Sequence, residues 1–327
     1  MSPSHLLDAT LDRSLVLGYT KIGPALRRRW WPADPAPGCL DGKRVVVTGA
    51  TSGIGEAMAQ SFAELGATVH LLGRNRAKVA TYAEDVRRQV PKADVVEEVC
   101  DVGDLDAVRA WCADLLGRVD ALHGLVHNAG AMPKERAETP QGHELALAAH
   151  VLGPHLMTEL LLPVLGAAQS MSQGSSVVFM SSGGMYGAGL RVEPDEIEFR
   201  DGVYDGVQAY ARTKRMQVVL AEAWSDRLRG GEVRVESMHP GWVATPGVSD
   251  SLPRFEKVMG PLLRDPRRGA DTAVWLVATR PESAGSHHFW HDRALRPTTY
   301  GWQRDEDPAR VRRFLAYVSG ATGTTAW

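Results

Sequence analysis

The sequence predicts an α/β fold of the Rossmann type, a doubly wound parallel sheet flanked by helices in a single domain. Short apolar or β-branched runs recur along the chain, segments with helical spacing lie between them, and a glycine-rich turn follows the first run. Strands that alternate with helices in this way form parallel sheets, because each helix carries the chain back to the edge where the next strand begins.

Six strands are expected, and they occupy residues 45–47, 68–72, 95–99, 122–126, 177–180 and 233–235. After the first strand, apolar residues recur at helical spacing until Gly66, a residue type that commonly ends helices. The composition does not break between residues 41 and 296, so we expect one domain there. An amphipathic extension and linker (1–40) precede it, and a tail (297–327) follows.

The composition excludes several classes of protein. The formal net charge is −2, so no global basic field attracts nucleic acid. The three cysteines (Cys39, Cys100 and Cys112) are too scattered for a disulfide framework or a zinc site. The first residues lack the basic start and apolar run of a secretory signal, and no run of about 18 apolar residues indicates a spanning helix. We therefore expect a cytoplasmic protein.

A glycine-rich turn at residues 48–55 reads Thr-Gly-Ala-Thr-Ser-Gly-Ile-Gly and stands between the first strand and a helix. Glycines let the backbone approach a pyrophosphate, which then lies at the positive end of the helix. The motif therefore indicates a dinucleotide cofactor, although a purely structural turn is the alternative. The expected contacts are Thr48, Gly49, Ser52, Gly53, Ile54 and Gly55.

The end of the second strand bears on the choice between NAD and NADP. Proteins that select NAD usually carry an acid there, which binds the ribose 2′-hydroxyl. Here Gly73 takes that place and Arg74 follows it. An arginine accommodates a 2′-phosphate, so the sequence favours NADP; the alternative is an arginine that only faces solvent.

Tyr210 and Lys214 form a candidate acid–base pair, because residues four apart share one face of a helix. The pKa of an ordinary tyrosine is about 10, too high for acid–base chemistry at neutral pH. A nearby cation stabilises the phenolate and so lowers that pKa.

These motifs together resemble the short-chain dehydrogenase/reductase family, over about residues 41–290. The residues that carry the resemblance, in the order of the family, are 48–55, Asp101, Asn128-Ala129-Gly130, Ser182, Tyr210, Lys214 and Pro240-Gly241.

The resemblance implies about seven parallel strands and an NAD(P)-dependent oxidoreductase, which moves a hydride between the nicotinamide and a carbonyl or alcohol carbon. In this family pattern Ser182 binds the substrate oxygen and Tyr210 exchanges its proton. Lys214 lowers the pKa of Tyr210 and holds the nicotinamide ribose. The other cofactor contacts that it implies are Asp101, Val102, Asn128, Ala129, Gly130, Pro240, Gly241, Val243 and Thr245.

Within the family, residues 181–185, 238–248 and 269–276 resemble one branch, which contains dehydrogenase/reductase member twelve and, as wider relatives, the retinol dehydrogenases. That branch implies a lipophilic carbonyl or alcohol as the small-molecule substrate. The family also implies homo-oligomers, formed through two long helices. A catalytically impaired cofactor-binding sensor of the same fold is the alternative function.

Two departures from the family pattern stand out. His150 occupies the helix position where the family has an asparagine that anchors a water of the proton relay. A histidine can donate and accept, so it substitutes or the relay is impaired. The interval from Ser182 to Tyr210 is also long, with an acidic stretch at 193–198 that borders the substrate entrance or is a solvated loop.

No metal centre is expected. His143-Glu144 is followed by Leu147 where a zinc-protease motif needs a second histidine.

The extension (1–31) has an amphipathic pattern, with apolar residues such as Leu7, Leu11 and Leu26, and ends in three arginines beside Trp30 and Trp31. Basic charge beside tryptophan is typical of a helix at a membrane surface. The alternative is that the apolar stripe packs on the enzyme itself or on a partner subunit.

Overall fold

The computed structural model describes residues 3–171, 174–251, 253–282, 288–300 and 306–327. One sheet of eight strands forms its centre, in the order β3-β2-β1-β4-β5-β6-β7-β8. The strands are β1 (Arg44–Thr48), β2 (Thr68–Gly73), β3 (Asp94–Val99), β4 (Gly124–His127), β5 (Ser175–Met180), β6 (Val233–Met238), β7 (Phe289–His291) and β8 (Ala294–Leu295).

The Rossmann-type prediction is confirmed, with eight strands in place of about seven. The first seven pair in parallel, and β8 pairs antiparallel with β7. Asp292 and Arg293 connect these two strands, and both have positive φ, at 50° and 55°. Such a turn matches the twist of a hairpin, but usually contains glycine or asparagine. The sequence therefore carried no ordinary turn signal for the eighth strand.

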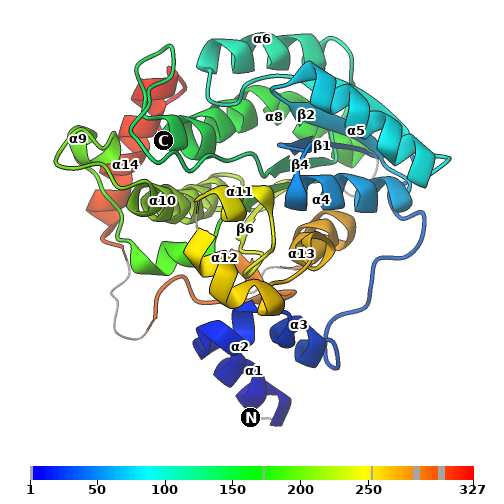
Figure 1. The fold of residues 1–327 in the computed structure, drawn as a ribbon. Helices are drawn as coiled ribbons and strands as arrows, with labels where there is room; N and C mark the ends of the chain where they lie inside the picture. The colour runs from blue at the N-terminus through cyan, green and yellow to red at the C-terminus, as the bar shows by residue number, and fades with distance from the viewer. Residues whose placement is uncertain (1–2, 172–173, 252, 283–287, 301–305) are drawn as a thin grey trace.

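Helices cover both faces of the sheet. On one face lie α4 (Gly53–Glu64), α5 (Arg76–Gln89) and α13 (Pro266–Thr279); on the other lie α6 (Leu105–Leu116), α8 (Gly153–Met171) and α10 (Gly206–Arg227) (Figure 1). Val45 and Val47 of β1 belong to the core beneath α4 and α13, whereas Val46 belongs to the opposite core. Both faces are buried at the centre of the sheet, which explains the continuous apolar runs within β1 and β5.

The N-terminal extension packs against the domain that contains the sheet. Its helices are α1 (Pro3–Arg13), α2 (Leu15–Tyr19) and α3 (Ile22–Arg27), drawn in blue at the lower end of Figure 1. Arg27 is fully buried, and its guanidinium lies 2.6 Å from Asp292 and 2.8 Å from Asp8. Trp31 lies over the guanidinium of Arg293 at 4.9 Å. The extension is therefore part of the folded unit.

The C-terminal segment contains a helix, α14 (Pro308–Thr322), drawn in red in Figure 1, which packs beside α8. Phe314 and Val318 are fully buried in the core of that face. Beyond the helix, the ring of Trp327 meets Trp224 of α10 edge to face, with 4.9 Å between centroids.

A continuous helical run joins α7 (Leu145–Leu147), the π-helix η1 (Ala148–Leu152) and the start of α8. The segment Leu145–Ala168 is long enough to cross a bilayer, and its most apolar 18-residue window has a mean hydropathy of 1.4, but 78% of that window is buried inside the fold. It is a central core helix, and its sequence is apolar over a long stretch because the helix is buried against the sheet. The shorter helices are η2 (Gly183–Gly187), α9 (Pro194–Ile197), α11 (Pro246–Ser251), α12 (Pro253–Met259) and η3 (Gly260–Leu262).

Candidate active site

A cavity of about 530 Å³ lies at the carboxyl ends of the central strands. β1 has β2 on one side and β4 on the other, so the connections leave it in opposite directions. In open α/β sheets this reversal opens a crevice, where ligands bind. The cavity extends from the end of β2, past the glycine-rich turn, to Tyr210 and Lys214.

Close backbone approach requires glycine in the turn at the start of α4. A Cβ on Gly55 would lie 2.1 Å from the carbonyl oxygen of Gly49, and Gly49 itself has a φ of +65°. Gly53, at a φ of +55°, begins α4 and faces Thr245. Free backbone N–H groups at a helix start carry partial positive charge, so this turn can hold a pyrophosphate.

Thr48 and Asn128 tie the turn to the neighbouring strand β4. The side chain of Asn128 donates to the carbonyl oxygens of Thr48 (3.0 Å) and Gly49 (3.3 Å). The backbone N–H groups of Asn128 and Ala129 both donate to the hydroxyl of Thr48 at 2.9 Å. These bonds fix the floor of the cavity.

Tyr210 and Lys214 come from the first half of α10, whose N-terminus is capped by the side chain of Asp205. The Lys214 Nζ lies 5.3 Å from the centroid of the Tyr210 ring. It donates to the carbonyl oxygen of Met180 at 2.8 Å and to Gln217 at 3.0 Å. Burial lowers the pKa of Lys214 to about 7, because the ammonium is removed from water.

Ser182 follows β5 and lies beside the Tyr210 phenol. Burial raises the pKa of Tyr210, and a hydrogen bond with Ser182 opposes that rise. The Ser182 hydroxyl also accepts from the backbone N–H of Gly184 at 3.2 Å, which orients it. The structure therefore brings Ser182, Tyr210 and Lys214 together.

His150 lies at the same end of the cavity, on the π-helix, and both of its ring nitrogens have partners. Nε2 accepts from the backbone N–H of Ala131 at 3.0 Å, so Nδ1 carries the proton and donates to Thr213 at 2.8 Å. Thr213 in turn donates to the carbonyl oxygen of Tyr210. Burial, then the nearby charge of Lys214, holds the pKa of His150 well below its usual range, so the ring is neutral.

At the opposite end, Arg74 lines the cavity together with Asn75 and Lys78. Asp101 lies in the same wall, and one of its oxygens accepts from the backbone N–H of Gly103 at 2.9 Å. Lys78 was not among the predicted residues, because a lysine in the first turn of a helix looks like ordinary surface charge.

The other predicted cofactor residues fall into two groups. Those that line the cavity are Gly49, Ser52, Gly53, Ile54, Val102, Asn128, Ala129, Gly130 and Thr245. Those that do not line it are Thr48, Gly55, Pro240, Gly241 and Val243. The sequence did not single out the lining residues Thr51, Ala131, Met132, Leu145 and Ser251, whose types carry no chemical signature.

The acidic stretch before α10 is divided between solvent and core. Glu193 and Asp195 are exposed, whereas Glu198 is 1% exposed. Glu198 accepts from the His143 ring at 2.7 Å and from the backbone N–H of Glu144 at 2.8 Å. It therefore anchors the inserted loop to the segment before α7.

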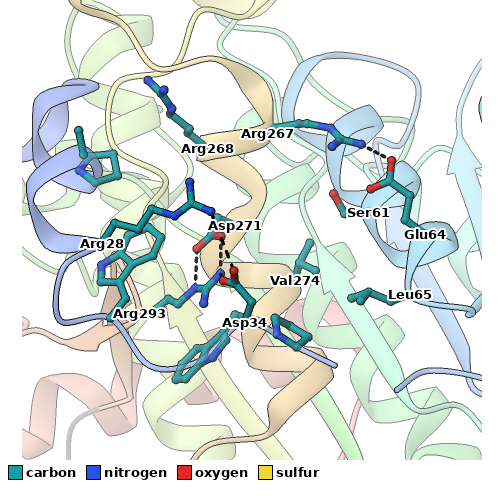
Figure 2. Close-up of a pocket in the computed structure, with 15 residues that line it drawn as sticks. Arg28, Asp34, Ser61, Glu64, Leu65, Arg267, Arg268, Asp271, Val274 and Arg293 are labelled. Carbon is teal, nitrogen blue, oxygen red and sulfur yellow. Dashed lines mark hydrogen bonds and ion pairs between the residues drawn. The ribbon is translucent and has the colours of Figure 1, made fainter. Parts of the chain in front are cut away.

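A second cavity, of about 510 Å³, lies between the segment that follows α3, the end of α4 and the start of α13 (Figure 2). Its arginines have carboxylate partners: Arg293 contacts Asp271 (2.6 Å) and Asp34 (2.7 Å), and Arg267 contacts Glu64. No tyrosine, lysine or histidine is among the described residues that line it. The acid–base groups belong to the first cavity.

Across the described part of the chain, no group of three or more His, Cys, Asp or Glu side chains converges as a metal site would.

Comparisons with known proteins agree with this geometry. A family model described as enoyl-(acyl carrier protein) reductase matches residues 49–278. Dehydrogenase/reductase SDR family member 12 of Homo sapiens is 34% identical over 78% of this chain and 78% of its own length. Retinol dehydrogenase 14 of Mus musculus is 30% identical over 89% of this chain and 90% of its own length.

A solved structure shares the fold. A short-chain dehydrogenase from Escherichia coli CFT073, complexed with NADPH, aligns with a TM-score of 0.57 at 24% identity, over 74% of this chain and 93% of that one. The chain belongs to the short-chain dehydrogenase/reductase family. It is an oxidoreductase of that family.

Proposed function

We propose that this enzyme transfers a hydride between a nicotinamide dinucleotide, preferably NADP(H), and the carbonyl or alcohol carbon of a lipophilic small molecule. The observation that carries the proposal is the placement of Tyr210, with Ser182 hydrogen-bonded to its phenol, and of Lys214 at one end of a cavity whose other end is a glycine-lined helix start with Arg74 beside it. An extended dinucleotide fits this arrangement.

The position of each residue in the cavity indicates its role in the reaction. The bound nicotinamide supplies or receives the hydride. Ser182 donates a hydrogen bond to the substrate oxygen, and Tyr210 gives or takes the proton at that oxygen. Lys214, when charged, favours the phenolate and so lowers the pKa of Tyr210 toward neutrality.

Two observations support a lipophilic substrate. Met132 lines the cavity next to Ala131, whose N–H donates to His150, and its side chain is apolar. Retinol dehydrogenase 14 matches along most of its own length, and its name specifies a lipid alcohol.

The proposal is tested by following NADPH oxidation at 340 nm with a panel of aldehydes, ketones and steroids of graded hydrophobicity. We expect turnover with apolar carbonyls and less with small polar ones. Absence of turnover in both directions, across the whole panel and with both cofactors, would favour the cofactor-binding sensor instead.

Arg74→Ala should remove most of the preference for NADPH over NADH. A charge-assisted hydrogen bond contributes about 1.5–3 kcal/mol, equivalent to roughly ten- to a hundredfold in affinity. Fluorescence titration of each cofactor measures the two dissociation constants. Arg76→Ala, two residues further in α5, is the control with the same charge change. A wild-type enzyme that prefers NADH contradicts the assignment.

We propose a cytoplasmic enzyme whose extension makes peripheral contact with anionic membranes. Asp8 and Asp12 point inward to the buried Arg27 and Arg296, so their charges do not oppose binding. The outer surface keeps exposed basic and apolar side chains, namely Arg13, Lys21, Arg28, Arg29, Leu7, Val16 and Leu17.

Co-sedimentation with phosphatidylserine vesicles at low salt should deplete the wild-type enzyme from the supernatant. Replacing Arg28 and Arg29 by alanine should weaken binding roughly thirtyfold, at about 1 kcal/mol for each basic residue. This pair is a better probe than a truncation, because the extension is part of the core. If the wild type does not bind, the extension serves the fold alone.

A further inference from the structure

Gln217 is a polar side chain that is fully buried on α10, three residues after Lys214. Its Oε1 accepts from the Lys214 ammonium at 3.0 Å. Its Nε2 donates to the backbone carbonyl oxygen of His150 at 2.9 Å. Both ends of the amide are therefore used, and the side chain forms a bridge between the lysine and the π-helix.

The backbone around His150 explains why its carbonyl receives this bond. In an α-helix that oxygen would accept from the N–H four residues later, but the residue there is Pro154, which has no N–H. Gln217 gives this oxygen a side-chain donor.

The Lys214 ammonium has three N–H donors, and two of them are directed by fixed acceptors. Met180 accepts one at 2.8 Å and Gln217 accepts the second. The third remains for the side of the ammonium that faces Tyr210 and the cavity. We propose that Gln217 is a positioning residue, which holds Lys214 in its working place and charge state by linking it to the carbonyl of His150.

An amide suits this task better than a carboxylate, because it accepts a hydrogen bond without neutralising the cation. The titratable groups that face Lys214 are Tyr210 and the neutral His150. Other titratable groups on the elements that pack against α10 are bonded elsewhere: Glu144 to Tyr204, Tyr186 to Pro297 and Glu236 to Trp290. The hydrogen bond that Gln217 accepts is thus, with that accepted by the Met180 carbonyl, the local support for the charged form.

Gln217→Met should lower the pKa of Lys214 by about one unit or more, because a hydrogen bond to the charged form favours that form. The measurement is NMR titration of the full chain labelled with [ε-¹³C]lysine, where Lys214 should titrate near 7. Lys214→Arg assigns its signal. Gln217→Asn, whose amide is one carbon too short to make both bonds, should shift the pKa in the same direction.

Met216→Ala is the matched control, since Met216 is equally buried on the same helix and belongs to the apolar core. It should lower the unfolding temperature and leave the Lys214 titration in place. If Gln217→Met and Gln217→Asn both titrate as the wild type does, Gln217 only fills space and the inference is wrong.

The catalytic consequence rests on the proposed function. At pH 8 we expect Gln217→Met to lower kcat about tenfold with an unchanged KM for the carbonyl, in proportion to the lost ammonium. The NMR readout needs no turnover. If the wild type is inactive but the pKa of Lys214 falls in the Gln217 variants, the result counts against the proposed function and still supports the role of Gln217. If the wild type is active and Gln217→Met keeps the wild-type kcat, the result counts against Gln217 as a positioning residue.

Discussion

Tyr210→Phe is expected to lower kcat by about 10²–10⁴-fold, the usual contribution of a positioned acid or base. The substitution removes the exchangeable proton but keeps the ring, which contacts the His150 ring at 5.5 Å and lies near the Lys214 ammonium. Cofactor affinity, measured by the quenching of tryptophan fluorescence, should change little.

Tyr82→Phe is the control for this experiment. Tyr82 lies on α5, and its hydroxyl donates to the carbonyl oxygen of Glu56, remote from the acid–base groups. It should retain the wild-type kcat. If Tyr210→Phe also retains it, the proton passes through some other group.

Asp292→Asn should lower the free energy of unfolding by about 3–5 kcal/mol, the usual cost of breaking a buried ion pair from one side. Asp292 lies 2.6 Å from both Arg27 and Arg264, and all three side chains are buried. Asparagine preserves the shape and tolerates the positive φ of the turn, so the loss of charge is what the variant measures. Denaturant unfolding gives the difference.

Arg28→Ala provides the comparison. Arg28 is 74% exposed and its nearest carboxylate, on Asp34, is 3.9 Å away, so the change should fall within about 0.5 kcal/mol. Equal stability of the Asp292 and Arg28 variants would mean that the extension is not held by its buried ion pairs.

The same carboxylate links stability to pH. Burial alone would raise the pKa of Asp292, but Arg264 and Arg27 outweigh it and the pKa is lowered. A carboxyl with a lowered folded-state pKa stabilises the fold above its unfolded pKa, near 3.8, and that stability is lost as the pH falls through the folded pKa. The loss in free energy of unfolding caused by Asp292→Asn should therefore be largest at pH 7 and should diminish in strong acid.

Local patterns predicted the parts of the molecule that depend on local chemistry. Short apolar or β-branched runs indicated six of the strands, and they are most continuous in β1 and β5, where both faces of the sheet are buried. The glycine turn was recognisable because close backbone approach excludes a Cβ, and Tyr210 and Lys214 were recognisable because four residues make one helical turn.

What escaped prediction depends on distant partners. Arg27 looked like one of three equivalent surface arginines, but Asp292, 265 residues later, draws it into the core. Gln217 looked like a polar position on a helix surface, and only the carbonyl of His150 gives it a role. The turn at Asp292-Arg293 adopts positive φ without glycine because ion pairs hold both side chains.

The position of α14 also means that a second copy of the chain would have to compete with the chain's own C-terminal segment for the same surface. Together with the residues after it, this helix covers α8 and α10: Thr324 bonds the His155 ring at 2.9 Å and Trp327 meets Trp224. A segment tethered this closely acts at an effective concentration on the order of millimolar. A second copy at micromolar concentration cannot displace it unless its contacts are about a thousandfold stronger. An oligomer of this chain would therefore assemble through a different surface from the pair of long helices that its family offers.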